Sequence, residues 1–319
     1  MNTIYKWFLL ILVLLGFCAC DEVDEADRFT GPVEFVPKKN VLIEDFTGQR
    51  CLNCPLAADA VHAMQATYGA DHVIAVAIHG GSLSLPASSG AGLALPEGET
   101  YHTFWGVSSW PKGLVDRGGG WSNPSEALLE YTSWSAEAVK RLQKEPAVDM
   151  TLNNTYDAET GQLTMQVDLK ANQAIADGYL QVWLTESGIT AYQTMPDGSH
   201  NREYVHDHVL RAIVNGQWGE AVALHATGDT HTISYTYALG DHPTWKADKM
   251  AVVAFVYSKT GGVLQVIESP VVQEPSASLI LTTPSRISTS KTYAYEKNLY
   301  PPIYYSGGPD LLCPIGNHR

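Results

Sequence analysis

Two cysteines separated by two residues are the part of this sequence best suited to covalent chemistry. Cys51 and Cys54 enclose Leu52 and Asn53, and Pro55 follows directly. A pair with this spacing can be a redox-active dithiol, a structural disulfide or half of a metal site. The rest of the chain must distinguish these three.

A metal site needs more ligands than the pair supplies. Structural zinc takes four ligands, commonly two cysteine pairs or one cysteine pair with two histidines. The sequence has no second CxxC, and His206 and His208 lie in a later segment with a different pattern. We therefore expect no metal at the cysteine pair and no cofactor in the protein.

The segments around the cysteines predict a β-α-β unit. Residues 40–48 form a β-rich run that ends in glycine, and residues 72–81 form the nearly continuous apolar run typical of a buried parallel strand. Between them, Pro55 suits the first turn of a helix and Gly69 its end. The apolar face predicted for this helix consists of Leu56, Ala60, Val61, Met64 and Tyr68.

This setting favours redox chemistry. Free N–H groups at the start of a helix stabilise a thiolate, here that of Cys51. Cys51 is expected to be the exposed attacking sulfur, and Cys54, one turn further on, is expected to resolve the mixed disulfide.

Residues on both sides of the pair resemble the thioredoxin superfamily. Asp45 and Phe46 stand six and five residues before Cys51, and Trp110-Pro111 precede a short apolar run. The resemblance implies that Asp45 accepts a proton from Cys54. It also implies that Pro111 is cis and presents the Trp110 backbone to a substrate peptide. The alternatives are that Asp45 simply ends a strand and that Pro111 is an ordinary trans loop proline.

The match to that superfamily is incomplete. Leu-Asn replaces the dipeptides found between the cysteines of thioredoxin and of strong oxidants, and it supplies no histidine to lower the pKa of Cys51. The interval from Cys54 to Pro111 is also longer than in thioredoxin, so it must hold an insertion.

From residue 147 the pattern changes to short alternating strands without helices between them. Four such strands are predicted, at residues 163–171, 178–186, 231–239 and 250–258, with turns at 157–161, 195–199 and 259–262. Strands at this density predict an antiparallel β-sandwich.

The chain begins with a segment typical of export. Residues 1–20 contain one lysine, an apolar run from Trp7 to Phe17 and then Cys18-Ala19-Cys20, which resembles a bacterial lipobox with Cys20 as the lipidated residue. A plain secretory signal is the alternative. Acyl chains on Cys20, palmitate among them, would anchor the protein in a membrane.

An acidic tether follows at residues 21–38, with five acidic residues among the first seven. Such a run after a lipidated cysteine resembles the export signal of surface lipoproteins, so we expect exposure at the cell surface, with the periplasmic face as the alternative. Outside the cytosol the remaining close pair, Cys51 and Cys54, is expected to be oxidised.

Charge excludes one class of partner. The chain has 20 Lys and Arg against 34 Asp and Glu, a formal net charge of −14. An acidic surface repels nucleic acid phosphates, so we expect no binding to DNA or RNA.

Three segments, residues 40–58, 181–193 and 204–220, resemble the outer membrane protein 28-related family of bacterial lipoproteins, over about residues 35–275. The resemblance implies an α/β plus all-β protein: a thioredoxin-like domain at 39–145 and an immunoglobulin-like β-sandwich at 146–275. It also implies attachment to the outer membrane through a lipid. Residues 276–319, with Cys313, fall outside it, and we expect them to be poorly ordered.

A second candidate site lies in the last of these segments. His206 and His208 would share one face of a strand, within reach of a common ligand, and Arg211 could meet a carboxylate of a partner. The alternative is a polar strand end whose groups are satisfied by hydrogen bonds.

Two functions remain open from the residues. One is thiol–disulfide exchange by Cys51 and Cys54 with an unidentified protein partner, assisted by Asp45 and Pro111. The other is non-catalytic binding of an unknown surface ligand, an adhesin-like role in which the disulfide is a local clip.

The lipid anchor is directly testable. Replacing Cys20 with alanine removes the acylated thioether, so Cys20→Ala should move the protein from the membrane pellet to the soluble fraction. Cys18→Ala serves as the matched control and should stay in the pellet. Unchanged fractionation of Cys20→Ala would contradict the assignment.

Overall fold

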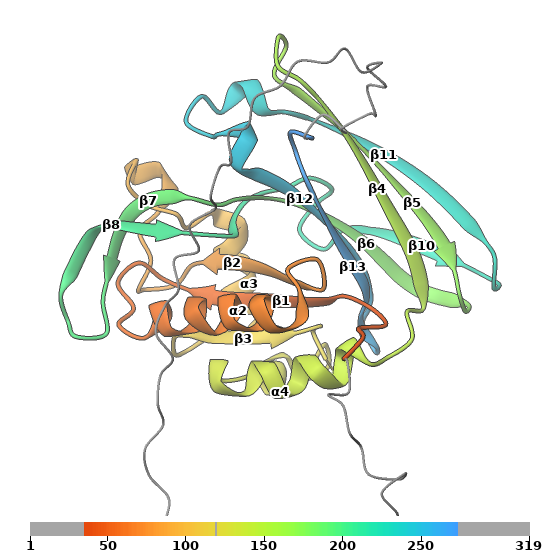
Figure 1. The fold of residues 1–319 in the computed structure, drawn as a ribbon, viewed down its shortest axis with the longest axis horizontal. Helices are drawn as coiled ribbons and strands as arrows, with labels where there is room; N and C mark the ends of the chain where they lie inside the picture. Colours follow the sequence, from red (N-terminus) through yellow and green to blue (C-terminus); the bar gives the residue numbers. More distant parts are fainter. Residues whose placement is uncertain (1–34, 119, 274–319) are drawn as a thin grey trace, which may run out of the picture. The chain divides into compact units, whose positions relative to one another are not determined.

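A strand, a helix and a second strand form the frame around the cysteine pair. The structure, a computed structural model, describes residues 35–118 and 120–273. β1 (Val41–Thr47) and β2 (Val73–His79) pair in parallel, and α2 (Cys54–Tyr68) connects them (Figure 1). The predicted β-α-β unit is confirmed, and Gly69 follows the last residue of the helix as expected.

Alternation along β1 decides which residues can face the helix. Val41 and Ile43 pack in the core shared with α2, whereas Leu42 and Phe46 pack in a core on the opposite face of the sheet. Because side chains of a strand alternate, Asp45 points to the same face as Val41 and Ile43. The carboxylate is therefore directed to the α2 side.

The buried face of α2 differs from the predicted one. Ala57, Val61 and Met64 are buried, while Leu56 is exposed. The helix begins at Cys54, which is itself buried, and a period of 3.6 residues then places Ala57 and Val61 below it. The small side chain of Ala57 also suits a close approach of the helix to the sheet.

Three further elements complete this part. α3 (Pro96–Trp105) was not predicted and lies within the segment that the sequence suggested as an insertion. β3 (Lys112–Val115) pairs antiparallel with β1. α4 (Tyr131–Leu142) buries Trp134 against the sheet.

Strands from the second half extend the same sheet. Its order is β13-β12-β6-β9-β2-β1-β3, with β10 also paired to β6. The join is made where β9 runs parallel to β2 at Ala77 and Val209. The strands after α4 are β4 (Val148–Asp157), β5 (Gln162–Ala171), β6 (Ile175–Glu186), β7 (Ile189–Thr194), β8 (His200–His206), β9 (Val209–Ile213), β10 (Glu220–Leu224), β11 (Thr230–Ala238), β12 (Met250–Ser258) and β13 (Gly262–Pro270).

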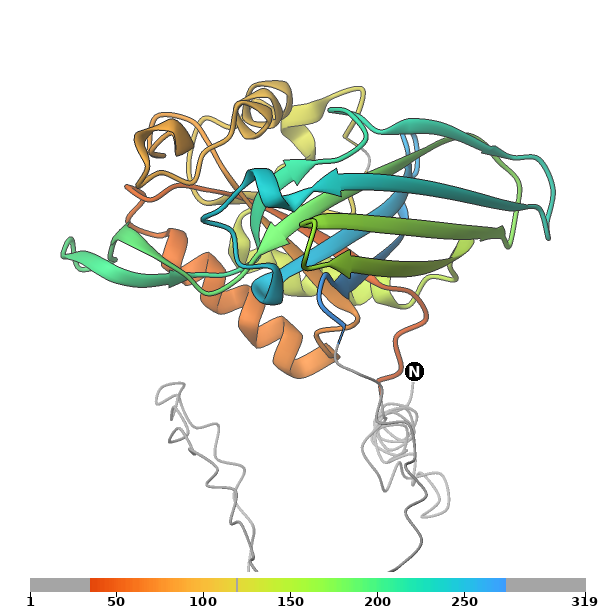
Figure 2. The ribbon, with the colours of Figure 1, turned by 90° about the horizontal axis from the view of Figure 1, so that it is seen from above.

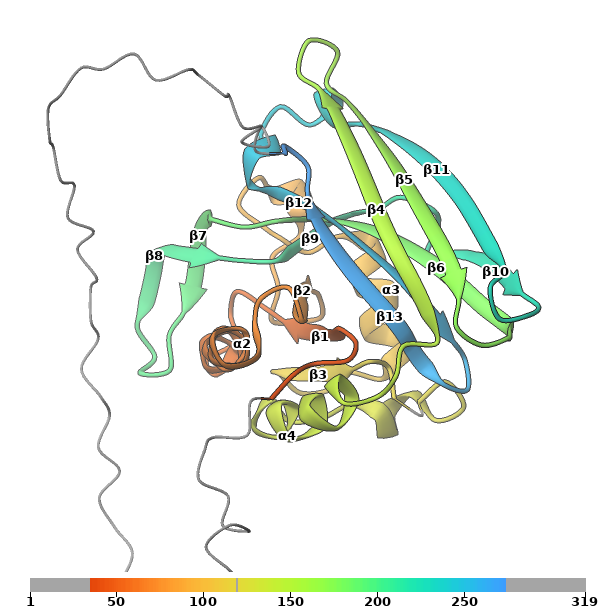
Figure 3. The same ribbon diagram turned by 45° about the vertical axis from the view of Figure 1, so that its right-hand side comes forward.

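A second sheet, β11-β5-β4, packs against β6 and β12. Alternating residues such as Leu163, Met165 and Val167 of β5 meet Val182 and Leu184 of β6 in one apolar core. The predicted sandwich of antiparallel sheets is visible in Figure 3 as the layer of long strands opposite β13. All four predicted strands and all three predicted turns are present.

β7 and β8 form a separate hairpin. They pair antiparallel from Ile189 with His206 to Thr194 with His200. Figure 2 shows the hairpin projecting from the body of the protein beside α2. It belongs by sequence to the second half but lies over the first.

The described residues, 35–118 and 120–273, belong to one contact unit, and strands of both halves share one sheet. The domain boundary between residues 145 and 146 stays a prediction. The signal segment, Cys20, most of the tether, the tail and Cys313 lie outside the described residues.

Two buried ion pairs of the first half lie at its border with the second. Arg117 donates to Glu44 of β1 at 2.6 Å and 3.0 Å, and both side chains are about fully buried. Next to it, Lys39 donates to Asp116 at 2.6 Å, and the backbone carbonyl of Asp116 accepts a hydrogen bond from the Val263 N–H of β13 at 2.7 Å. The loop after β3 is therefore a polar junction inside the protein.

Removing one partner should expose the cost of a buried charge. Arg117→Met leaves the buried carboxyl group of Glu44 without a partner and should lower the free energy of unfolding by about 3–5 kcal/mol. The double variant Glu44→Leu/Arg117→Met should recover most of that loss. Chemical denaturation measures both, and Arg50→Met, at an exposed arginine, should change stability by less than about 0.5 kcal/mol. Equal stability of the single variant and wild type would contradict the assignment.

Candidate functional site

The C-terminal ends of β1 and β2 line a hollow on the α2 side of the sheet. Asp45 and Thr47 of β1 alternate with core residues, and Ala75, Ala77 and His79 do the same on β2. Binding sites in open α/β sheets lie outside the carboxyl ends of parallel strands. The hollow occupies that position.

The cysteine pair closes the loop between β1 and α2. Cys51 and Cys54 form a disulfide, which confirms the expectation that the pair is oxidised. α2 begins at Cys54 with Asn53 as its N-cap residue. Cys54 thus belongs to the first turn of the helix, and Cys51 precedes it by one turn.

The accessibility of Cys51 corrects one expectation. Cys51 is only 1% exposed and Cys54 3%, whereas Leu52 between them is 47% exposed. The predicted exposed attacking sulfur is therefore wrong for this conformation. The physical reason is a cover that comes from the second half of the chain.

That cover is the β7–β8 hairpin. The Gln193 side-chain amide donates to the Cys51 carbonyl at 2.8 Å and to the Gly48 carbonyl at 3.4 Å. The Thr194 N–H donates to the Gln49 carbonyl at 2.9 Å. Strand β7 is thereby hydrogen-bonded to the loop that carries the disulfide.

Gln49 of the disulfide loop forms further hydrogen bonds between this loop and strand β7. Its amide donates to the carbonyls of Tyr192 at 3.2 Å and Ala91 at 3.0 Å, and its side-chain oxygen accepts from the Leu93 N–H at 3.1 Å. Gln49 is fully buried. A buried glutamine with these bonds joins three separate segments.

Asp45 is the buried acid of the hollow. The residue is 5% exposed, and its Oδ1 atom has no hydrogen-bond partner within the described part of the chain. Burial without a counter-charge raises its pKa to about 8. Asp45 therefore holds a proton near neutral pH, in a hollow that Cys54 also lines.

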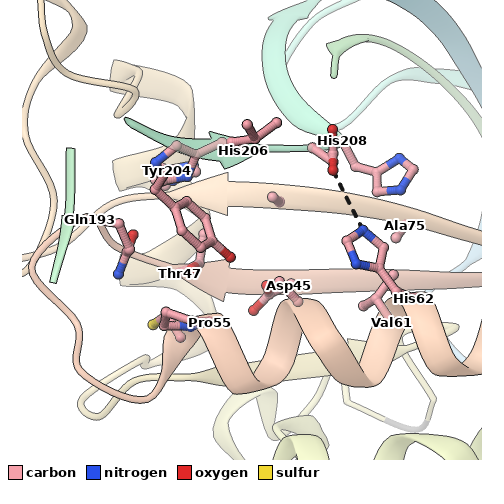
Figure 4. A pocket seen from close by; sticks show the side chains of 16 residues that line it. Asp45, Thr47, Pro55, Val61, His62, Ala75, Gln193, Tyr204, His206 and His208 are labelled. Atoms are coloured by element: carbon pink, nitrogen blue, oxygen red, sulfur yellow. Dashed lines mark ion pairs between the residues drawn. The ribbon is translucent and has the colours of Figure 1, made fainter. Parts of the chain in front are cut away.

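Tyr204 of β8 reaches toward this carboxyl group across the hollow (Figure 4). Burial raises the pKa of its phenol to about 12, with smaller contributions from Asp59, Asp207 and Asp45. The hairpin thus supplies the wall opposite Asp45.

Histidines form the upper wall of the hollow. The His79 and His206 rings meet edge to face with centroids 5.4 Å apart, and neither His79 nitrogen has a partner among the residues described. Burial lowers the pKa of His206 to about 4 and that of His79 well below its ordinary value, where His206 and His102 add to the effect. These imidazoles are neutral at physiological pH.

His206 and His208 do not share a strand face. β8 ends at His206, and His208 has a positive φ of 56°, so the backbone turns between them. Both nevertheless line the hollow. His208 faces His62 of α2 with ring centroids 6.4 Å apart, and His62 lies 3.5 Å from Asp207 at the rim.

Arg211 is occupied within the chain. Its guanidinium donates to Glu186 at 2.7 Å and lies 5.3 Å from the Trp245 ring centroid. The carboxylate that Arg211 meets therefore belongs to Glu186 of the same chain and not to a partner. Arg211 does not line the hollow at Cys54.

Pro111 and Trp110 lie at the other edge of β1. The Trp110–Pro111 peptide is cis, as predicted. β3 pairs Lys112 with Phe46, and continuing that register places Pro111 beside Thr47, at the start of the disulfide loop. The Trp110 ring stacks toward His102 at 6.1 Å, and neither residue lines the hollow.

Several residues of the site were not found from the sequence. They are Gln49, His62, His79, Gln193, Tyr204 and Asp207. Among these, His79 at the end of the apolar run of β2 carried a usable signal, because a polar residue ending a buried parallel strand points to the binding edge. Within residues 35–118 and 120–273, no group of three histidine, cysteine or acidic side chains could hold a metal ion. No helix in these ranges is both long and apolar enough to cross a membrane.

Comparison with known proteins adds a family and a fold. The profile of the family described as outer membrane protein Omp28 matches residues 98–274. Among solved structures, HBP35 of Porphyromonas gingivalis is similar over 82% of this chain and 83% of its own, with a TM-score of 0.59 and 19% identity. A domain of the outer membrane lipoprotein Omp28 from Porphyromonas gingivalis is 24% identical, covering 39% of this chain and 86% of that domain, with a TM-score of 0.26. None of the curated proteins matches.

Asp45 should make stability depend on pH. Its folded pKa of about 8 lies above the ordinary value of 3.8, so its favourable contribution is complete below pH 3.8 and is lost as the pH rises through 8. Asp45→Asn removes this pH-dependent loss of stability, because asparagine does not ionise. Relative to wild type, the variant should gain stability, on the order of a few kcal/mol, between pH 4 and pH 8.

Denaturation curves at several pH values measure this difference. Asp59→Asn, at an exposed carboxylate of α2, is the matched control and should show a flat difference. A flat difference for Asp45→Asn would show that Asp45 is ionised in the folded protein.

Proposed function

The chain belongs to the outer membrane protein Omp28 family, and we propose that this member exchanges thiols and disulfides through Cys51 and Cys54. The predicted family is confirmed, and the matched segment ends at residue 274, before the tail. Its place is the outer membrane. Anchoring through Cys20 and exposure at the cell surface complete the proposal.

One observation carries the proposal: Cys54 of the disulfide lines the same hollow as the buried carboxyl group of Asp45. Exchange breaks the Cys51–Cys54 bond and produces a thiolate on one sulfur, and this thiolate must gain a proton when the pair becomes a dithiol. Asp45 holds a proton in the hollow that Cys54 lines. It can donate that proton to a Cys54 thiolate and accept it again when Cys54 attacks.

The surrounding architecture supports the same chemistry. The disulfide lies between a parallel strand and the first turn of the crossover helix, with a cis-proline in register with the end of β1. We assign this part to the thioredoxin-like type and the facing antiparallel sheets to the immunoglobulin-like type. Under that assignment, Asp45 has the supporting role expected from the sequence.

Loop length argues against a purely structural disulfide. Crosslinking two residues three positions apart restricts the unfolded chain very little, because the entropic gain grows with the size of the closed loop. Stability by itself is thus a weak reason for the bond.

The burial of Cys51 favours a second candidate. A disulfide that is 1–3% exposed and fixed by Gln193 resembles a clip that holds a surface loop. In that case the protein is a non-catalytic binding protein of the outer membrane. Its ligand would bind elsewhere on the surface.

The midpoint potential of the pair separates the two candidates. An exchange protein should equilibrate with glutathione buffers at roughly −120 to −270 mV and should reduce insulin or oxidise a dithiol peptide. The variant with both cysteines replaced by serine is the control and should be inactive. A potential below about −300 mV, with neither activity measurable, would establish the structural clip instead.

A further inference from the structure

The two sulfur atoms of the disulfide have different surroundings. On one side the β7–β8 hairpin covers Cys51, with Gln193 bonded to its carbonyl and Thr194 bonded to Gln49 two residues before it. On the other side Cys54 lines the hollow, whereas Cys51 is not among the lining residues. Access to the bond is therefore through Cys54.

The hairpin occupies the place that a protein partner would need. A partner that pairs with the disulfide loop as an extended strand uses backbone groups of that loop, and here the Gln49 carbonyl already accepts from the Thr194 N–H of β7. The carbonyls of Gly48 and Cys51 are both bonded by Gln193. The hairpin thus already occupies the backbone acceptors of the loop.

The hollow itself admits only a small molecule. Its cavity volume is about 50 Å³. Small apolar side chains form the walls: Pro55, Ala58 and Val61 from α2, and Ala75 and Ala77 from β2. Tyr204 and Val205 of the hairpin close the opposite side, as Figure 4 shows for Tyr204.

The inner groups of the hollow are uncharged at neutral pH. Asp45 is protonated because burial raises its pKa to about 8, and burial keeps the pKa of His206 near 4. His62 and Asp207, which lie 3.5 Å apart, are at the rim, 51% and 31% exposed. A ligand that carries its own charges into the hollow would lose hydration without gaining a counter-ion.

From this geometry we infer that the reductant of the Cys51–Cys54 disulfide is a low-molecular-weight thiol, uncharged apart from its reacting sulfur, that attacks Cys54 from the hollow, while the hairpin excludes protein thiols. The inference rests on the proposed exchange function. It names the substrate class and reverses the order of the sulfurs that the sequence suggested.

The steps balance as follows. The small thiol first loses its proton to solvent, and its thiolate bonds to Sγ of Cys54. The bond between Cys51 and Cys54 breaks, and Cys51 leaves as a thiolate that takes a proton from solvent. A second thiolate attacks the sulfur of the bound thiol, and Cys54 leaves as a thiolate that takes the proton of Asp45. Asp45 regains a proton from solvent. Two small thiols become one disulfide, and the protein gains two electrons and two protons.

The first test compares three reductants of the oxidised, full-length protein. They are mercaptoethanol, glutathione and a small folded protein with one exposed cysteine, with rates divided by thiolate concentration. Mercaptoethanol should react about tenfold faster than glutathione and about 100-fold faster than the protein thiol. Alkylation of the freed cysteines followed by mass spectrometry measures each rate.

The outcomes separate the two proposals. A protein thiol that reacts within threefold of mercaptoethanol would overturn the small-thiol inference and leave the exchange function in place. Failure of all three reductants at accessible concentrations would instead remove the exchange function.

Variants of the hollow and of its cover give a second test. Ala58→Phe fills the hollow and should slow mercaptoethanol about tenfold, whereas Ala63→Phe, on the exposed face of the same helix, should change nothing. Gln193→Ala loosens the cover and should accelerate the protein thiol more than it accelerates mercaptoethanol. Unchanged rates in both Ala58→Phe and Gln193→Ala would contradict the inference.

Single-cysteine variants test which sulfur is attacked. With hydroxyethyl disulfide as probe, Cys54 in Cys51→Ser should form the mixed disulfide about tenfold faster than Cys51 in Cys54→Ser. The opposite order would show that Cys51 is the accessible sulfur, and equal rates would show that the hairpin covers neither.

Discussion

The ion pair between Arg117 and Glu44 is the interaction on which the arrangement of the two halves depends. Glu44 belongs to β1 of the first half, and the Arg117 guanidinium lies 4.7–4.9 Å from the ring centroids of Phe255 and Tyr257 in β12 of the second half. A buried cation needs a counter-charge and polarisable neighbours, and both are supplied only when the halves are packed together. The neighbouring pair of Lys39 and Asp116 adds a backbone bond to β13. The junction therefore selects one relative placement of the sheets.

That placement brings the β7–β8 hairpin over the disulfide. β9 follows the hairpin directly and pairs with β2 at Ala77, so the hairpin must begin and end near the carboxyl ends of β1 and β2. Gln49 and Gln193 then replace the water that the loop carbonyls would otherwise bind. The pairing of β9 with β2 thus both covers part of the site and holds the two halves together. The disulfide is thereby covered at Cys51 and borders the hollow at Cys54.

Local patterns predicted the elements that bear the chemistry. The apolar runs of β1 and β2, Pro55 at the start of α2 and Gly69 after its end act through neighbours in the sequence, and the β-α-β unit follows from them. The alternating residues of β5, β6, β11 and β12 likewise predicted the sandwich. α3 was missed because its first turn holds Pro96 and Gly98 and shows no strong apolar period. The apolar face of α2 was misplaced at Leu56 because the sheet, not the helix, decides which side is covered.

The sequence by itself determined the cysteine pair and the buried strand that carries Asp45, since both are encoded by residue type and short spacing. Resemblance of its motifs to known families supplied the cis-proline and the membership of an outer membrane family. Only the tertiary structure decided that Cys51 is covered, that Arg211 is paired with Glu186, and that His79 meets His206. These contacts join residues between 25 and more than 120 positions apart, and they form through packing of whole sheets. Spacing along a chain carries no information about such pairs, because their distance is set by the fold that every other residue helps to stabilise.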